Sequence, residues 1–260
     1  MNPLLVNDCI VRSPSPSPRA RLFCFPYAGG SSSIYSRWHT GLSEGTEVYA
    51  VELPGRGWRS SEPCAKDMDS LVERLCSAFE SMLDLPFFFF GHSMGALLAF
   101  SCARALRRRH LRLPEHLFVS ARVPPERPNP DRSALTMTDQ ELIEMIRRRG
   151  GTPPEVLAEP DLMARLLPSI RADFVLLDSY RYVPDAPLGC PITGFTGTRD
   201  TYATKLDLGE WALHTTGPFS LLEFEGGHFF INSGRDRVVR SVDQAIRDSL
   251  RAGGHSRAPG

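Results

Sequence analysis

The sequence has 260 residues, which is enough for one α/β domain with a sizeable core or for two small domains. Hydrophobic residues make up 42% of the chain and charged residues 23%, as is usual for a globular protein. Lysine plus arginine equals aspartate plus glutamate at 30 each, and this balance argues against a nucleic-acid binder or a membrane-surface protein.

The cysteines and the apolar segments indicate the compartment. Six cysteines are scattered without a C-x-x-C pair, which argues against a disulfide framework or a metal site. Cys24, Cys76 and Cys102 fall in apolar segments and are predicted to lie in the core. There is no signal-peptide pattern and no apolar run of transmembrane length, so we expect a cytoplasmic protein.

Both ends of the chain differ in composition from its middle. A Ser-Pro run at residues 13–18 predicts a flexible N-terminal segment over residues 1–18, with residues 9–12 as a candidate edge strand. The small and polar residues 252–260 predict a disordered tail. Residues 19–251 are predicted to form a single domain.

Strand and helix patterns alternate through most of this domain, which predicts a mainly parallel sheet flanked by helices. The predicted strands are 21–25, 47–51, 86–90, 117–120, 191–195 and 219–224. The predicted helices are 34–42, 69–83, 94–109, 208–213 and 229–250.

The alternation stops between residues 124 and 182, where only helical patterns occur. A capping box begins one helix at Thr138, and Pro168 predicts a kink or a break in a second helix over 161–180. A helical insertion that follows a strand of such a sheet is a candidate lid over the active site. The alternative is a peripheral packing element.

The most informative pattern is G-x-S-x-G at residues 91–95, centred on Ser93. Four phenylalanines precede it as a buried strand, and a good helix sequence follows it. Strand, sharp turn and helix are the context of a nucleophile elbow. His92, although adjacent, is not expected to reach the Ser93 hydroxyl.

A serine nucleophile needs a base and an acid, which follow it in such sheets in the order serine, acid, histidine. His228 stands in a glycine-rich turn after the strand at 219–224, and Asp200 in a glycine turn after the strand at 191–195. We therefore predict a catalytic triad of Ser93, Asp200 and His228. The less favoured candidates are His110, His116 and His214 for the base, and Asp178, Asp185 and Asp207 for the acid.

Acyl transfer also needs donors for a tetrahedral oxyanion. One is expected from the residue after the nucleophile, Met94, and the other from the loop after the first long strand. In that loop Ala28 is the first choice for the oxyanion hole and Tyr27 the second.

With these motifs in place, the chain resembles the type II (editing) thioesterases of polyketide and nonribosomal peptide biosynthesis, which have the α/β-hydrolase fold. The most specific shared motifs are Pro-Tyr-Ala-Gly-Gly at 26–30 and Arg-Ala-Asp-Phe at 171–174. Others are Leu-Pro-Gly-Arg at 53–56, Gly-Gly-Thr-Pro at 150–153, Cys-Pro-Ile at 190–192 and Gly-Gly-His-Phe-Phe at 226–230. One departure is Ala121, where the family frequently has glycine.

The resemblance implies a hydrolase that needs no cofactor and acts on acyl groups carried by the phosphopantetheine arm of acyl or peptidyl carrier proteins. It implies the same triad and oxyanion donors, a helical lid, and a role in antibiotic biosynthesis. We expect no nucleic-acid or membrane partner, and a monomer.

Apolar residues of the predicted lid are candidates for an acyl chamber. They include Met145, Ile146, Phe174 and Leu177, each of which is also suited to packing the insertion on itself. Arginines 107–109 and Arg112 are a weaker candidate for docking a carrier protein. The alternative functions are a carboxylesterase or lipase, and an acyltransferase that uses small-molecule acyl donors.

Overall fold

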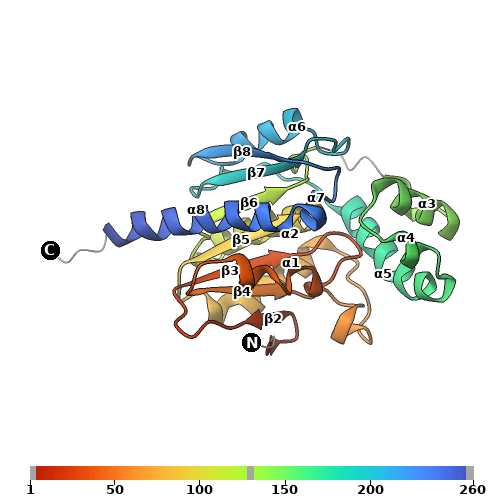
Figure 1. Ribbon diagram of the computed structural model, residues 1–260, viewed down its shortest axis with the longest axis horizontal. Coiled ribbons are helices and arrows are strands. Elements are labelled where there is room, and N and C mark those ends of the chain that lie inside the picture. The colour runs from red at the N-terminus through yellow and green to blue at the C-terminus, as the bar shows by residue number, and fades with distance from the viewer. Residues whose placement is uncertain (1–3, 128–131, 256–260) are drawn as a thin grey trace.

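The computed structural model describes residues 4–127 and 132–255, and their strands form one sheet of eight in the order β1-β2-β4-β3-β5-β6-β7-β8. From β4 to β8 neighbouring strands are parallel, whereas β1 and β2 pair antiparallel at one edge. This architecture confirms the predicted α/β-hydrolase fold (Figure 1). The strands are β1 (Leu4–Asn7), β2 (Ile10–Ser13), β3 (Ala20–Phe25), β4 (Thr46–Val51), β5 (Phe87–His92), β6 (His116–Ser120), β7 (Ile192–Gly197) and β8 (Phe219–Phe224).

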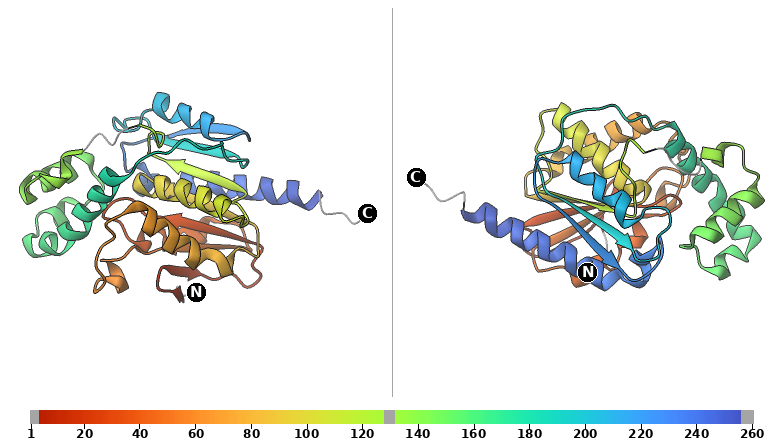
Figure 2. Two further views of the ribbon diagram at one scale, coloured as in Figure 1. Left: turned by 180° about the vertical axis from the view of Figure 1, so that it is seen from behind. Right: turned by 90° about the horizontal axis from the view of Figure 1, so that it is seen from above.

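Helices cover both faces of the sheet. α1 and α2 lie on one face and α8 lies on the other (Figures 1 and 2). The α-helices are α1 (Met68–Phe79), α2 (Met94–Arg108), α3 (Asp139–Arg149), α4 (Pro154–Leu157), α5 (Pro160–Ser179), α6 (Lys205–Gly209), α7 (Phe230–Ser233) and α8 (Arg235–His255).

The four phenylalanines of β5 show why this strand lies at the centre of the protein. Phe87 and Phe89 belong to the core on the α1 and α2 face, whereas Phe88 and Phe90 belong to the core under α8. Because successive side chains of a strand point to opposite faces, one run of apolar residues supplies both cores. The prediction that Cys24, Cys76 and Cys102 lie in the core is confirmed.

The N-terminal segment differs from its prediction. The candidate edge strand at residues 9–12 is confirmed as β2, which pairs with β4 from Ile10 to Ser13. The prediction that residues 1–18 are flexible was wrong for residues 4–13, because β1 pairs with β2 in an antiparallel hairpin. Ile10 is fully buried, because it completes the core at this edge of the sheet. Backbone pairing with β4 orders the chain as far as Ser13, at the start of the Ser-Pro run. The rest of this run lies in the link between β2 and β3, which forms neither helix nor strand.

Other boundaries also differ. In place of the helix predicted at 34–42 there are two 3-10 helices, Ser32–Tyr35 and Trp38–Gly41, and they bury Tyr35 and Trp38 in the core. The predicted C-terminal helix is divided at Gly234 into α7 and α8. α8 continues to His255, beyond the predicted end at 250, so the prediction of disorder was wrong for residues 252–255. Residues 256–260 of the predicted tail lie outside the described residues.

Between β6 and β7 the described residues contain helices and no strand. They are a 3-10 helix at Arg132–Leu135, then α3, α4 and α5, which stand together at one end of the molecule (Figures 1 and 2). We call residues 132–179 the insertion. The capping box at Thr138 is confirmed. The break predicted at Pro168 is absent, because this proline lies on the exposed side of α5, where water can satisfy the carbonyl group that it leaves unpaired.

Candidate active site

Ser93 occupies a strained turn between β5 and α2. Its φ of 54° and ψ of −116° place it in a region that side chains rarely adopt. An added Cβ at Gly91 would lie 2.1 Å from the carbonyl oxygen of Gly95, and one at Gly95 would lie 2.1 Å from that of Phe25. The N–H of Ser93 donates to the carbonyl of Ser120 at 2.7 Å. The two glycines therefore permit the sharp turn that the sequence predicts.

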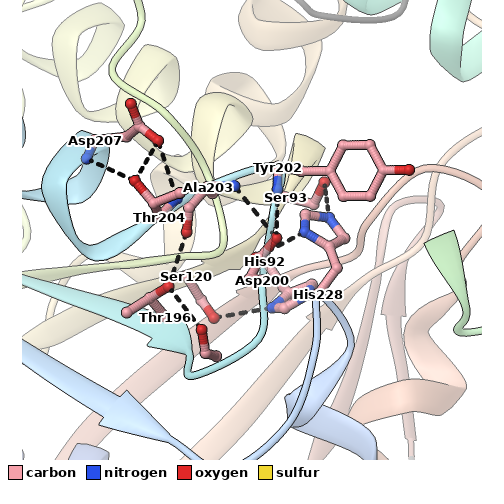
Figure 3. A network of polar contacts seen from close by, with 11 residues as sticks. His92, Ser93, Ser120, Thr196, Asp200, Tyr202, Ala203, Thr204, Asp207 and His228 are labelled. Carbon is pink, nitrogen blue, oxygen red and sulfur yellow. Dashed lines mark hydrogen bonds and ion pairs between the residues drawn. The ribbon is translucent and has the colours of Figure 1, made fainter.

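The structure brings together the three residues that were predicted as a triad (Figure 3). His228 Nε2 lies 3.1 Å from Ser93 Oγ, and His228 Nδ1 lies 2.9 Å from Asp200 Oδ2. All three residues are buried. Because Nδ1 faces a carboxylate, it carries the proton, which leaves Nε2 to accept the hydrogen bond from the Ser93 hydroxyl.

Backbone hydrogen bonds fix the positions of the Asp200 carboxylate and the His228 imidazole. The other carboxylate oxygen of Asp200 accepts the N–H groups of Tyr202 at 2.8 Å and Ala203 at 3.2 Å. The Asp200 turn follows β7 and the His228 turn follows β8, so both lie at the carboxyl edge of the sheet. The N–H of Arg199 donates to the carbonyl of Gly226 at 2.8 Å, which joins the two turns.

The less favoured candidates lie in other environments. His116 Nε2 is 2.8 Å from Thr193 Oγ1, in the middle of the sheet. His214 Nε2 is 2.9 Å from Glu126, and its ring is buried rather than on the surface. Asp207 forms the capping box of α6. None of these three contacts Ser93 or His228 by a hydrogen bond.

His92 lies next to the triad without bonding to Ser93 Oγ. Its Nδ1 is 2.8 Å from Ser120 Oγ, and its ring centroid is 5.6 Å from that of His228 (Figure 3). Burial lowers the pKa of His92 well below its usual value, and the nearby charge of His228 adds to this. His92 therefore stays neutral at working pH and supports the imidazole of His228 by packing.

The predicted oxyanion donors lie at the junction of α2 with the loop of residues 27–30, which we call the oxyanion loop. Met94 is the first residue of α2, so its N–H has no partner within the helix. The close approach of Gly95 to Phe25 presses the start of α2 against this loop. The N–H of Gly29 donates to Asp173 at 2.7 Å, so it is already in use. Ala28 remains our prediction for the second donor.

A cavity of about 240 Å³ lies between the oxyanion loop and the insertion. Ile146 and Phe174 line it, whereas Met145 and Leu177, the other two predicted acyl-chamber residues, are buried but not among its lining residues. The sequence did not indicate Arg149, which also lines the cavity. Its guanidinium lies 4.2 Å from the ring centroid of Tyr202 and 5.4 Å from that of Phe174.

Phe229, the residue after His228, connects the cavity with the site and was also missed. Its ring centroid lies 4.8 Å from that of Tyr27 and 5.0 Å from that of His228. The loop after α3 rests on this ring, because an added Cβ at Gly151 would lie 2.6 Å from it. The motifs at 150–153 and 226–230 contained these residues, but their contact became visible only in three dimensions.

The arginines at the end of α2 lie far from Ser93. Arg107 pairs with Asp185 and Arg109 with Glu80. α2 begins beside Ser93 and has 15 residues, so its far end lies about 22 Å away at 1.5 Å per residue. The arginines therefore lie at the other end of α2 from Ser93, and their role in docking a carrier protein stays a hypothesis.

Within residues 4–127 and 132–255, no group of three or more histidine, cysteine, aspartate or glutamate side chains is arranged to hold a metal ion. Among the same residues, no helix has the length and apolar character needed to cross a membrane.

Comparison with known proteins places this site in context. A family model described as thioesterase domain matches residues 20–246. Thioesterase PikA5 from Streptomyces venezuelae is 39% identical over 234 residues, which cover 90% of this chain and 83% of that protein.

Two solved structures are similar over most of their length. The RedJ thioesterase from the prodiginine biosynthetic pathway in Streptomyces coelicolor is 37% identical with a TM-score of 0.83, covering 89% of each chain. The type II thioesterase BorB from the borrelidin biosynthetic cluster is 34% identical with a TM-score of 0.84, covering 95% of this chain and 99% of that one.

Proposed function

Because the chain belongs to the thioesterase domain family, we propose that it hydrolyses acyl groups from the phosphopantetheine arm of acyl or peptidyl carrier proteins. In this function it is a type II thioesterase that removes stalled or aberrant chains from polyketide or nonribosomal peptide synthases. Support comes from RedJ and BorB, which are thioesterases from two biosynthetic clusters.

The observation that carries the proposal is the continuous hydrogen-bond chain from Ser93 through His228 to Asp200. We assign Ser93 as the nucleophile, which attacks the thioester carbonyl while His228 Nε2 takes its proton. Asp200 holds the imidazole in the required tautomer and stabilises the imidazolium that forms. The N–H groups of Met94 and Ala28 are the proposed donors to the tetrahedral oxyanion.

The intermediate then collapses and the C–S bond breaks. His228 gives its proton to the departing pantetheine thiol, and the acyl group remains as an ester on Ser93 Oγ. A water molecule, deprotonated by His228, attacks this ester and releases the carboxylic acid. Because a thioester is an activated acyl donor, these groups suffice without further electrophilic assistance.

The insertion acts as a lid in this proposal. The cavity of about 240 Å³ beside the oxyanion loop is lined by apolar residues of both regions, including Ala28 and Phe174, together with Arg149. The apolar part of this lining suits an acyl chain.

The test is hydrolysis of a panel of acyl groups on a phosphopantetheinylated carrier protein, beside the same acyl groups as simple oxyesters. We expect the carrier thioesters to give the higher kcat/KM. Ser93→Ala should lower kcat by about 10⁴- to 10⁶-fold. Equal turnover of the oxyesters would favour the carboxylesterase alternative. Acyl transfer to an added amine or alcohol in place of water would favour the acyltransferase.

A further inference from the structure

Two motifs of the family resemblance meet beside the oxyanion loop and have no role in the chemistry above. Arg56 ends the Leu-Pro-Gly-Arg motif after β4, and Asp173 lies in the Arg-Ala-Asp-Phe motif within α5. The Arg56 guanidinium donates from Nη1 to Oδ2 and from Nη2 to Oδ1 of Asp173, each at 2.6 Å. Arg56 is 8% exposed and Asp173 is 3% exposed, so this two-bond ion pair is buried.

The same ion pair also holds the backbone of the oxyanion loop. Asp173 Oδ2 accepts the N–H of Gly29 at 2.7 Å, and Arg56 Nη1 donates to the carbonyl of Gly30 at 3.1 Å. From the same helix, Ile170 packs so closely on Gly29 that an added Cβ would lie 2.6 Å from its Cγ1. The loop is therefore fixed at the two residues that directly follow Ala28.

We propose that Asp173 and Arg56 are positioning residues, which hold the oxyanion loop where its backbone N–H can meet the oxyanion of the transition state. The inference rests on the proposed function, because it assigns a task within the same site. A backbone donor is effective only when it lies about 2.7–3.1 Å from the place that the oxyanion will occupy. A small shift of the loop is therefore enough to slow the reaction.

The energetics of a buried ion pair make both partners necessary. Burial lowers the pKa of Arg56, but the charge of Asp173 more than offsets this and raises it above its usual value. Removing one charge leaves the other buried and only partly satisfied, which is costly in a low-dielectric interior. Without the Asp173 carboxylate, the Arg56 guanidinium shifts toward other hydrogen-bond acceptors. Because it also donates to the carbonyl of Gly30, this shift moves the oxyanion loop.

This arrangement also couples the insertion to the reaction. Asp173 lies in the second half of α5, 117 residues from Arg56 in sequence. Any displacement of this part of α5 withdraws the acceptor from Gly29. The position of the helix therefore sets the geometry of the oxyanion loop.

The experiment compares Asp173→Asn and Arg56→Lys with the unchanged protein, using an acyl-pantetheine thioester as substrate. Asparagine keeps the shape and loses the charge, whereas lysine keeps the charge and loses the two-bond geometry. We expect kcat to fall by about tenfold or more, with KM changed less than about twofold. An alkyl boronic acid, which forms a tetrahedral adduct with Ser93, should bind more weakly by a similar factor. A thioether analogue of the substrate, which lacks the carbonyl, should bind as before.

Asp243→Asn is the matched control. Asp243 is 5% exposed, accepts the N–H of Ser43 at 2.7 Å and pairs with Arg247 at 2.8 Å, but it lies in α8. This variant should lose thermal stability and keep kcat and boronic-acid affinity. Equal losses of boronic-acid affinity in Asp243→Asn and Asp173→Asn would overturn the inference, as would an unchanged kcat in Asp173→Asn. Activity that persists in Ser93→Ala would overturn the proposed function itself.

Discussion

The carboxyl edge of the sheet and the insertion hold their residues in different ways. At the edge, Ser93, Asp200 and His228 stand in turns that backbone hydrogen bonds join directly to neighbouring strands and turns. The insertion depends on side chains: α5 buries eight residues, α3 buries three, and α4 buries none. The reacting groups are thus fixed by backbone hydrogen bonds, whereas the insertion wall of the cavity is held mainly by side-chain packing.

This difference predicts different consequences for substitutions in the two regions. A substitution at the carboxyl edge of the sheet should lower the rate of the reaction strongly while the protein stays folded. A change in the insertion should alter the site through its few contacts with the edge, with smaller effects on rate.

After Ser93→Ala, the largest effect on rate is expected from Asp200→Asn. An amide can donate a hydrogen bond to His228 and so favour the wrong tautomer, which should lower kcat by about 10⁴-fold. The measurement is kcat for an acyl-pantetheine thioester. Asp207→Asn is the control, because Asp207 caps α6 and should leave kcat unchanged. A loss of less than about 100-fold in Asp200→Asn would show that the backbone does not fix the chemistry as described.

The second effect concerns stability and acid. Burial lowers the pKa of His116 to about 4, and it also lowers that of His92. Below about pH 6.5 these histidines therefore bind protons in the unfolded chain but not in the folded protein. Their contribution to the free energy of unfolding is full above this pH and is lost as the pH falls toward 4. His116 alone should account for about 2 kcal/mol of the loss at pH 5.

The insertion contains no histidine, so this acid sensitivity of the histidines arises outside the insertion. His116→Asn should flatten the dependence of the free energy of unfolding on pH, as measured by urea titration between pH 8 and pH 5. If the variant keeps the full slope, His116 is not the group responsible.

The smallest effect is expected at the contact between the insertion and the His228 turn. Gly151→Ala places a methyl group 2.6 Å from the Phe229 ring, at a φ of +97°, and should lift the loop from that ring. We expect kcat/KM to fall by about tenfold. Gly150→Ala is the control, because Gly150 also has positive φ but an added Cβ there meets nothing within 4 Å. Similar losses in both variants would attribute the effect to backbone strain alone.

The sequence was most informative where local geometry demands particular residues. Gly91 and Gly95 are required by backbone contacts of 2.1 Å, so the turn around Ser93 is recognisable from its motif. β7 before Asp200 and β8 before His228 each lead into a turn that contains glycine. The chain order of serine, acid and histidine then predicted that the side chains of Ser93, Asp200 and His228 lie together.

Features that depend on distant partners could not be predicted in the same way. Arg56 and Asp173 both stand in motifs that mark the family, yet nothing local indicates that one binds the other. Of the hairpin, β2 was predicted as a candidate edge strand at residues 9–12, but β1 and its pairing with β2 were missed for a similar reason. Its strands are short, and their stability comes from pairing with β4 rather than from their own composition.

That hairpin has a consequence for solubility. All six residues of β4 are buried, and β2 supplies the hydrogen-bonding partner along its outer side. Without the hairpin, β4 would present an uncovered apolar strand edge, on which a second chain can pair. A protein that lacks residues 1–13 should therefore self-associate, which light scattering at increasing concentration would detect. Residues 4–13 contribute no group to the proposed reaction, but they cover the edge of β4 and so prevent a second molecule from pairing with it.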